Sequence, residues 1–233
     1  MRVILLLGVN FLRAQWIVVV VMLAYVAGIN GFLAWNVQPG EVLVFLRIQG
    51  LYAISFVLLT AIPAIHTERK SRRILVVLSK GIERWQYLGG ILCGCALIAG
   101  IFCLMVGLAA VLGGARTNSP VTGLVPLLLM VFSASVCVAS IGIFCSTFLH
   151  PMLATGLASV LVAVPSLGMM RGWNLSPVLF PVGEVVRRVS DFKFREPDAG
   201  VWTVVAAALV QALLFWIAGT LTFARRDVTT SSE

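Results

Sequence analysis

Charged residues are scarce in this sequence. Asp, Glu, Lys and Arg together make up 11% of its 233 residues, whereas a soluble domain carries roughly a quarter. Hydrophobic residues reach 60% and the mean hydropathy is +1.04, so the folded chain has too little polar surface to face water on all sides. The composition therefore excludes a soluble globular protein and indicates that lipid is the solvent.

Motifs of catalytic and nucleotide-binding chemistry are absent as well. The sequence has no GxxxxGK[ST], no HExxH, no GxSxG and no paired carboxylates inside its apolar stretches. The two histidines, His66 and His150, lie at the ends of apolar stretches, where an interfacial position is expected. The five cysteines lie inside apolar stretches without metal-ligand spacing, as small packing residues do: Cys93, Cys95, Cys103, Cys137 and Cys145. We therefore expect no enzymatic activity, no metal and no organic cofactor in this chain.

Long apolar stretches dominate what is present. Six of them are near the roughly 20 residues that a helix needs to cross hydrocarbon, at about 14–35, 42–65, 87–112, 121–147, 151–170 and 201–223. They lack the alternation of a barrel strand, so helix is the expected form. The first is longer than the 7–15 apolar residues of a signal peptide and is expected to remain in the mature protein. The predicted fold is an all-α integral membrane protein with six transmembrane helices, forming one transmembrane domain at 1–227 and a polar tail at 228–233.

Shorter elements are expected beside the spans. Residues 1–13 are apolar with Arg2 and Arg13 near their ends, which predicts an N-terminal interfacial helix. Residues 148–151 separate the fourth and fifth spans, and Pro151 suits the first turn of a new helix. The segment 175–189 is too apolar for a free loop and is broken by Pro177 and Pro181, so it predicts one or two short re-entrant or interfacial helices before the last span. An ordinary extracytoplasmic loop remains the alternative there.

The distribution of Lys and Arg predicts the orientation. With the N-terminus inside, ten of the 17 basic residues fall in inside segments and six in outside segments, with Arg47 near the outer end of the second span. The bias favours cytoplasmic N- and C-termini and places residues 66–86 in the cytoplasm. The formal net charge of +8 therefore points to orientation and lipid headgroups, and without an RNA- or DNA-binding motif we expect no nucleic-acid partner.

The cytoplasmic loop is the densest run of charge in the chain. It predicts a helix with one apolar stripe flanked by cations, and that stripe consists of Ile74, Leu75, Val77, Leu78 and Ile82. A positive-inside anchor and a lipid-surface helix are two alternatives for such a segment. An anchor needs only a few cations, and not an ordered apolar stripe followed by a break at 79–81 and a direct return to the membrane. A docking surface for a cytoplasmic partner is therefore the preferred interpretation.

This loop resembles that of the permease subunits of type-2 ABC exporters. In that family a Glu with basic residues comes first, then an apolar helix, then a basic or aromatic start of the third span; here these are residues 68–73 (ERKSRR), 74–79 (ILVVLS) and 84–89 (RWQYLG). The six-span layout, the interfacial helix, the short helices before the last span and the final Arg-Arg-Asp at 225–227 are similar too. Two departures are Arg73 running directly into Ile74, where the family has Gly, and Ser79-Lys80, where it often has Pro.

The resemblance implies a function and partners. The loop would be a coupling helix seated in a groove of a separate ATPase subunit, which would bind ATP and Mg²⁺. Two permease copies, as a homodimer or a heterodimer, would join two ATPase copies in a bacterial-type inner membrane and export a substrate. The residues implied in ATPase coupling are Glu68, Arg69, Arg72, Arg73, Ile74, Leu78, Lys80 and Arg84. Ile74 and Leu78 would fill the groove, and the charged residues would pair with its surface.

The sequence leaves the cargo and one competing function open. Arg47 is the cation that comes closest to mid-membrane, and it either snorkels outward or joins Gln49 and Tyr52 along a substrate path. Small residues on the third and fourth spans predict close helix packing or a self-association seam. The apolar interior suits an amphipathic or lipid-like cargo. The competing function is a membrane anchor or assembly factor, similar to those of cytochrome maturation, that recruits a cytoplasmic partner and transports nothing.

Overall fold

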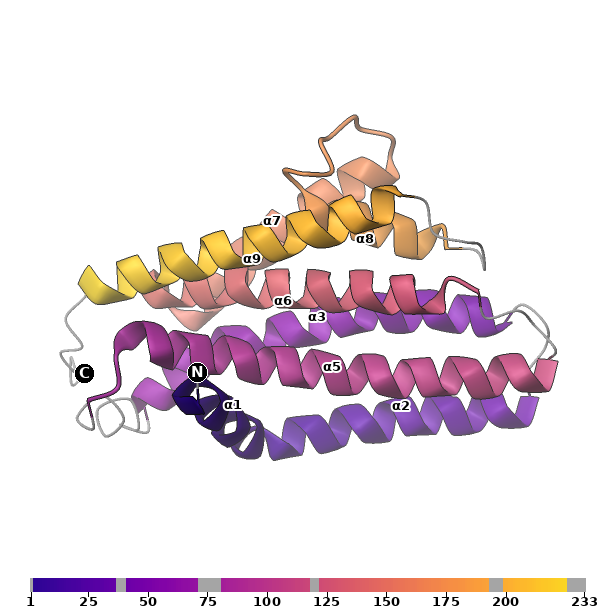
Figure 1. Ribbon diagram of the computed structural model, residues 1–233, viewed down its shortest axis with the longest axis horizontal. Helices are drawn as coiled ribbons and strands as arrows, with labels where there is room; N and C mark the ends of the chain where they lie inside the picture. Colours follow the sequence, from indigo (N-terminus) through magenta and orange to yellow (C-terminus); the bar gives the residue numbers. More distant parts are fainter. Residues whose placement is uncertain (1, 37–40, 71–80, 118–121, 193–198, 226–233) are drawn as a thin grey trace.

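The computed structural model describes residues 2–36, 41–70, 81–117, 122–192 and 199–225. Within these ranges the chain is helical apart from short connections and contains no strand. Figure 1 shows the long helices running side by side as one bundle. The helices are α1 (Arg2–Ala14), α2 (Trp16–Asn36), α3 (Glu41–Lys70), α5 (Arg84–Thr117), α6 (Leu124–Phe148), α7 (Pro151–Met170), α8 (Pro181–Ser190) and α9 (Gly200–Arg225).

The expected all-α membrane architecture agrees with these helices. By length and composition five of them can cross a membrane, namely α3, α5, α6, α7 and α9, and a sixth crossing results if α1 and α2 count as one bent span. The two are bent by 69° at the break between Ala14 and Trp16, which is where the expected interfacial helix meets the first span. Several helices extend beyond their apolar cores, because a helix continues as long as its backbone hydrogen bonds are made.

Helix α6 is the centre of the bundle. It packs against α9, α3, α5, α7 and α8. In its most apolar stretch of 18 residues, 78% is buried inside the protein. Its buried hydroxyls donate to carbonyls of their own helix: Ser133 to Met130, Ser135 to Val131 and Ser140 to Cys137. The small residues predicted to form a narrow surface on the fourth span are therefore covered by neighbouring helices of the same chain, and their polar groups are satisfied locally.

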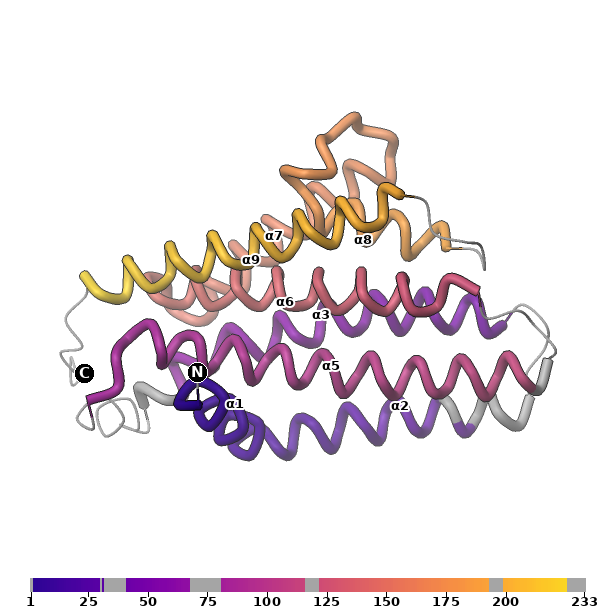
Figure 2. The backbone as a smooth tube through the Cα atoms, viewed as in Figure 1, coloured from indigo at the N-terminus to yellow at the C-terminus, as the bar shows by residue number. Residues whose placement is uncertain are grey.

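Glycines on α5 seat the first helix. A Cβ on Gly90 would lie 2.5 Å from Leu7 Cβ, and one on Gly94 would lie 2.4 Å from Phe11 Cδ1. Residues 90 and 94 are one helical turn apart, so they form a groove along one face of α5. Figure 2 shows α1 lying across the first turns of α5 at an angle to α2. The first part of the small-residue face of the third span therefore binds α1 within the chain, whereas Gly100 and Gly107 face α6.

Prolines are the first residues of helices α7 and α8. Leu149 and His150 are extended, and Pro151 starts α7 at its first helical position, as expected of a tight turn between the fourth and fifth spans. Pro181 starts α8 in the same way. A short helix before the last span is thus present at residues 181–190. It overlaps the predicted segment 175–189 and extends one residue beyond it.

Candidate functional site

Most of the predicted ATPase-coupling residues cannot be placed. Arg72, Arg73, Ile74, Leu78 and Lys80 lie outside the described residues. Glu68 and Arg69 belong to the last turn of α3, where the backbone alone is described. What the structure does place is each flank of the segment: the end of α3 before it, and the start of α5 with Arg84 after it. We call this end of the bundle the 71–80 end.

Arg84 binds the last turn of α9. Its Nη1 donates to the carbonyl oxygens of Phe223 and Ala224, at 2.8 and 2.7 Å. Its guanidinium also lies 5.8 Å from the centre of the Phe223 ring. The last four carbonyls of a helix have no partner within the helix, and the helix dipole favours a cation there. Arg84 therefore closes the C-terminal end of α9 from the first turn of α5.

Aromatic contacts extend this junction. The rings of Tyr87 and Phe223 are stacked with centroids 6.2 Å apart, and Trp85 meets Trp216 edge to face at 6.3 Å. Phe223 is completely buried. Such pairs add about 0.5–1.5 kcal/mol each beyond the area they bury. The start of α5 and the last three turns of α9 thus form one unit, which we call the α5–α9 junction.

The other flank of the segment is attached to a different helix. His66, near the end of α3, and His150, immediately before α7, have ring centroids 5.5 Å apart in an edge-to-face arrangement. Both rings are exposed, which agrees with the interfacial position expected for them. Residues 71–80 are therefore bounded on one side by an α3–α7 contact and on the other by the α5–α9 junction.

The three residues of the predicted substrate path point in different directions. Arg47 donates through Nε and Nη2 to the carbonyl oxygen of Phe192, at 3.1 and 2.6 Å, just after α8. Tyr52 is exposed and stacks on Tyr25 of α2 with centroids 5.0 Å apart. Gln49 is completely buried among α3, α5 and α6. The structure does not bring the three side chains together.

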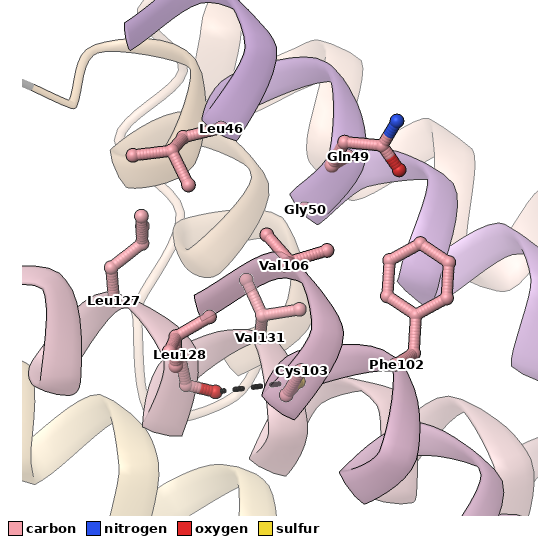
Figure 3. Close-up of a pocket in the computed structure, with 9 residues that line it drawn as sticks. All are labelled: Leu46, Gln49, Gly50, Phe102, Cys103, Val106, Leu127, Leu128 and Val131. Carbon is pink, nitrogen blue, oxygen red and sulfur yellow. Dashed lines mark hydrogen bonds between the residues drawn. The ribbon is translucent and has the colours of Figure 1, made fainter. Parts of the chain in front are cut away.

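A small cavity lies beside Gln49. Its walls are apolar apart from Gln49 and Cys103, whose Sγ lies 3.8 Å from the carbonyl oxygen of Leu128 (Figure 3). The cavity volume is about 10 Å³, about the space that one water molecule needs. Neither the nitrogen nor the oxygen of the Gln49 amide has a hydrogen-bond partner among the described residues. The cavity is too small for an organic cargo, and its volume suits one water molecule beside the Gln49 amide.

A buried carboxylate organises α8 near the opposite end of the bundle. Glu184 is 3% exposed; Arg187 donates to both of its oxygens at 2.6 and 2.9 Å, and Arg188 donates to one at 2.7 Å. Burial alone would raise the pKa of Glu184, but the hydrogen bonds and charges of the two arginines outweigh it and lower that pKa. This cluster was not among the predicted site residues, although the Glu-x-x-Arg-Arg spacing places both arginines on the turn beside Glu184.

Gln211 on α9 is a second polar residue that the sequence did not single out. Its Nε2 donates to the carbonyl oxygen of Leu179, at 3.2 Å, and its Oε1 accepts from Cys137 Sγ at 3.3 Å. A lone Gln in an apolar run is the signal that was available, because such a residue in lipid needs a partner on a neighbouring element. Here it joins α6, α9 and the connection between α7 and α8.

No group of three or more His, Cys, Asp or Glu side chains that could hold a metal ion occurs among the described residues. The chain matches no known protein-family model and no curated protein.

Proposed function

We propose that this chain is the membrane-spanning permease subunit of an ATP-driven ABC exporter. In this proposal residues 71–80 dock on a separate ATPase subunit in the cytoplasm, and both chain termini lie on the same side in a bacterial-type inner membrane. Five or six long apolar helices support a multi-pass membrane protein. The basic, amphipathic loop and its resemblance to the exporter family support the specific assignment.

One observation carries the proposal. The two flanks of residues 71–80 are attached to different helices, α3 to α7 through His66 and His150, and α5 to α9 through Arg84. A partner that moved this segment would therefore act on two pairs of helices at once. A loop that served only to hold the chain in the bilayer would need no such attachments, because orientation depends on the number of cations near the membrane.

The assembly follows from the same proposal. ATP and Mg²⁺ belong to the ATPase subunit, of which two copies would join two permease copies. Helix α6 packs against both attached pairs, so movement of either pair reaches the centre of the bundle. The interior is apolar and its small side chains are satisfied within their own helix, which favours an amphipathic or lipid-like cargo. Arg47, Gln49 and Tyr52 would meet such a cargo only in another arrangement of the helices.

The experiment is purification of the tagged chain in mild detergent with mass spectrometry of its partners. We expect a P-loop ATPase in stoichiometric amount. Arg72→Glu combined with Arg73→Glu should release it, because both changes reverse charge on the docking segment. Arg13→Glu combined with Arg225→Glu is the matched control, since it makes the same change in net charge on exposed residues of α1 and α9.

Two results would contradict the proposal. The first is a folded chain that brings no ATPase with it, which would favour the membrane anchor or assembly factor instead. The second is an ATPase that is retained by the Arg72 and Arg73 variant as well as by the control, which would place docking elsewhere.

A further inference from the structure

The 71–80 end of the bundle brings together the two histidines of the chain. His66 and His150 are the only histidines in the sequence and lie far apart along it, yet their ring centroids are 5.5 Å apart. Both side chains are exposed. Within the part of the chain that the structure describes, neither imidazole takes part in a hydrogen bond or an ion pair. Their ring nitrogens are therefore open to a ligand from solution.

The backbone holds each of the two rings in a defined place. His66 lies within α3, which continues as a helix to Lys70. His150 is extended, with φ −64° and ψ 147°, immediately before Pro151. The proline disfavours a helical conformation for the residue that precedes it, so the direction of the His150 side chain is set by the start of α7. The pair is thus mounted on two elements that are formed independently of each other.

The separation of the rings matches that of two imidazoles bound to one tetrahedral metal ion. With a Zn–N bond of about 2.0–2.1 Å, the centroid of an imidazole ring lies about 3.2 Å from the metal, and two such rings at the tetrahedral angle are about 5.2 Å apart. The observed 5.5 Å differs little from this value. The ring planes are inclined at 65°, so the rings are not stacked face to face, and nitrogen lone pairs in the two ring planes can converge on one point.

We propose that His66 and His150 form a binding site for a divalent transition-metal ion, with Zn²⁺ as its first candidate, and that the bound ion ties α3 to α7. Neutral imidazole suits zinc, copper and nickel, whereas magnesium and calcium prefer oxygen ligands. The proposal goes beyond the proposed function and does not depend on it, because it follows from the two rings alone.

The helix ends around the pair favour a cation. Helix α3 ends at Lys70, one turn after His66, and α6 ends at Phe148, just before His150. The C-terminal end of a helix carries a partial negative charge, and its N-terminal end carries a partial positive one. Two C-terminal ends and the single N-terminal end of α7 meet at the pair, so their combined effect on a bound cation is attractive.

Two protein ligands make this a reversible site. Structural zinc sites use four protein ligands, whereas here the exposed position of the rings leaves the remaining coordination positions to water. The ion would therefore exchange with solution, and the α3–α7 contact would strengthen when the ion is bound. The other flank of residues 71–80 has no such dependence, since Arg84 ties α5 to α9 through two carbonyls.

A zinc titration of the full chain tests the proposal. The chain is purified with a peptide tag that contains no histidine, freed of metal with a chelator, and titrated with Zn²⁺ against a colorimetric indicator. We expect one Zn²⁺ per chain, which Mg²⁺ does not displace. His66→Gln and His150→Gln should each weaken binding by at least about tenfold, because even the loss of an outer-shell partner costs about 10–100-fold in metal affinity. The double variant should be little weaker than either single one, since one change already breaks the pair.

Two further variants separate loss of a ligand from a change at the surface. Met152→Gln is the matched control: Met152 is 82% exposed in the first turn of α7, so this change introduces the same side chain beside the site without removing a ligand. It should bind zinc as the unchanged chain does. His66→Cys should retain zinc binding, because a cysteine thiolate is also a zinc ligand.

Hydrogen–deuterium exchange of the unchanged chain gives a second measurement. Zinc should slow exchange in both the last turn of α3 and the first turn of α7, since the ion joins them. This measurement uses no variant and therefore holds even if a histidine substitution unfolds the protein.

Four results would overturn the proposal: no zinc binding that depends on the histidines, two ions of which each single variant removes one, an equal loss in Met152→Gln, or protection confined to one of the two helices. None of these results involves the ATPase. A failure of the metal site therefore leaves the proposed function intact, and the absence of an ATPase partner leaves the metal site intact.

Discussion

Gly94→Ala should displace α1 from α5 and destabilise the protein. A Cβ at this position would lie 2.4 Å from Phe11 Cδ1 and 3.1 Å from the backbone oxygen of Gly8. Two carbon atoms pack best at about 3.5–4.0 Å, so α1 must move by about 1 Å or more. Phe11 is only 4% exposed, and the backbone of Gly8 blocks a purely local adjustment.

The expected magnitude comes from two opposing effects. Overpacking of this kind costs about 1–3 kcal/mol, while Ala stabilises a helix interior by about 1 kcal/mol relative to Gly. The net change for Gly94→Ala should therefore be a loss of about 0–2 kcal/mol. Gly100→Ala on the same helix is the matched control, because its Cβ would meet only Phe132, at an ordinary 3.8 Å. The control should be neutral or slightly stabilised.

Thermal unfolding in detergent and hydrogen–deuterium exchange of residues 2–14 measure the effect. For a chain of this size we expect the midpoint of Gly94→Ala to fall by up to about 8 °C, and α1 to exchange faster than in the control. Adding Phe11→Leu should recover part of the loss, since the smaller side chain makes room for the new methyl. A midpoint of Gly94→Ala at or above that of Gly100→Ala, with unchanged exchange in α1, would refute the reasoning.

Three further changes probe other parts of the bundle. Arg84→Gln should speed hydrogen–deuterium exchange in the last turn of α9 and cost about 1–3 kcal/mol, because two carbonyls lose a charged donor; unchanged exchange would contradict this. Glu184→Gln should lower the unfolding midpoint at pH 7. Since the folded pKa of Glu184 is lowered, its contribution is present above the unfolded value of about 4.3 and is lost as pH falls through the folded pKa, so the two proteins should converge in acid; a pH-independent gap argues against ionisation as the cause. Gln49→Leu should leave stability unchanged or raise it, because an unsatisfied buried amide is removed; a clear loss would reveal a hydrogen-bond partner, such as a water molecule in the cavity.

The sequence predicted the long helices well, because each is an apolar run bounded by charges, glycine or proline. Pro151 marked the start of α7, as expected, whereas Pro181, expected only to interrupt its segment, is the first residue of α8. These signals are local: proline fixes its own φ and removes its own donor wherever the chain goes. The bend between α1 and α2 was also visible, since the apolar segment changes from amphipathic to uniformly apolar near Gln15.

The partners of individual side chains could not be predicted in the same way. Arg84 and Phe223 are 139 residues apart, and no local pattern connects them. The contact of Arg84 with an ATPase subunit stays a prediction, whereas its contact with α9 is a property of the fold. For Arg47, Gln49 and Tyr52 the helix period gives only part of the answer. Gln49 and Tyr52, three residues apart, share a side of the helix, whereas Arg47, two residues before Gln49, faces away from it. The helix period does not reveal that Gln49 is buried whereas Tyr52 is exposed, and a common substrate path for the three residues stays a prediction.

The depth of the α7–α8 connection shows a different limit of hydropathy. Pro177 and Pro181 interrupt the helix, but a break of this kind is equally compatible with a loop in water and a turn in the membrane. The structure adds a contact that hydropathy does not give: the carbonyl oxygen of Leu179 accepts from Gln211, near the middle of α9. A polar residue in an apolar span thus identifies the height at which another segment meets it, because an amide in hydrocarbon requires a partner at its own level.

The arrangement of small residues on α6 bears on how motion could pass through the bundle. This helix contacts α3 and α7 on one side of the proposed coupling and α5 and α9 on the other. Its hydroxyls bond mainly within the helix, with Thr147 to Thr222 at 2.9 Å as one link across to α9. Few specific bonds would therefore break if the attached pairs slid along α6, whereas Arg84 would have to release two carbonyls for α5 to leave α9. A displacement of residues 71–80 should accordingly move α5 and α9 together, and shift both relative to α6.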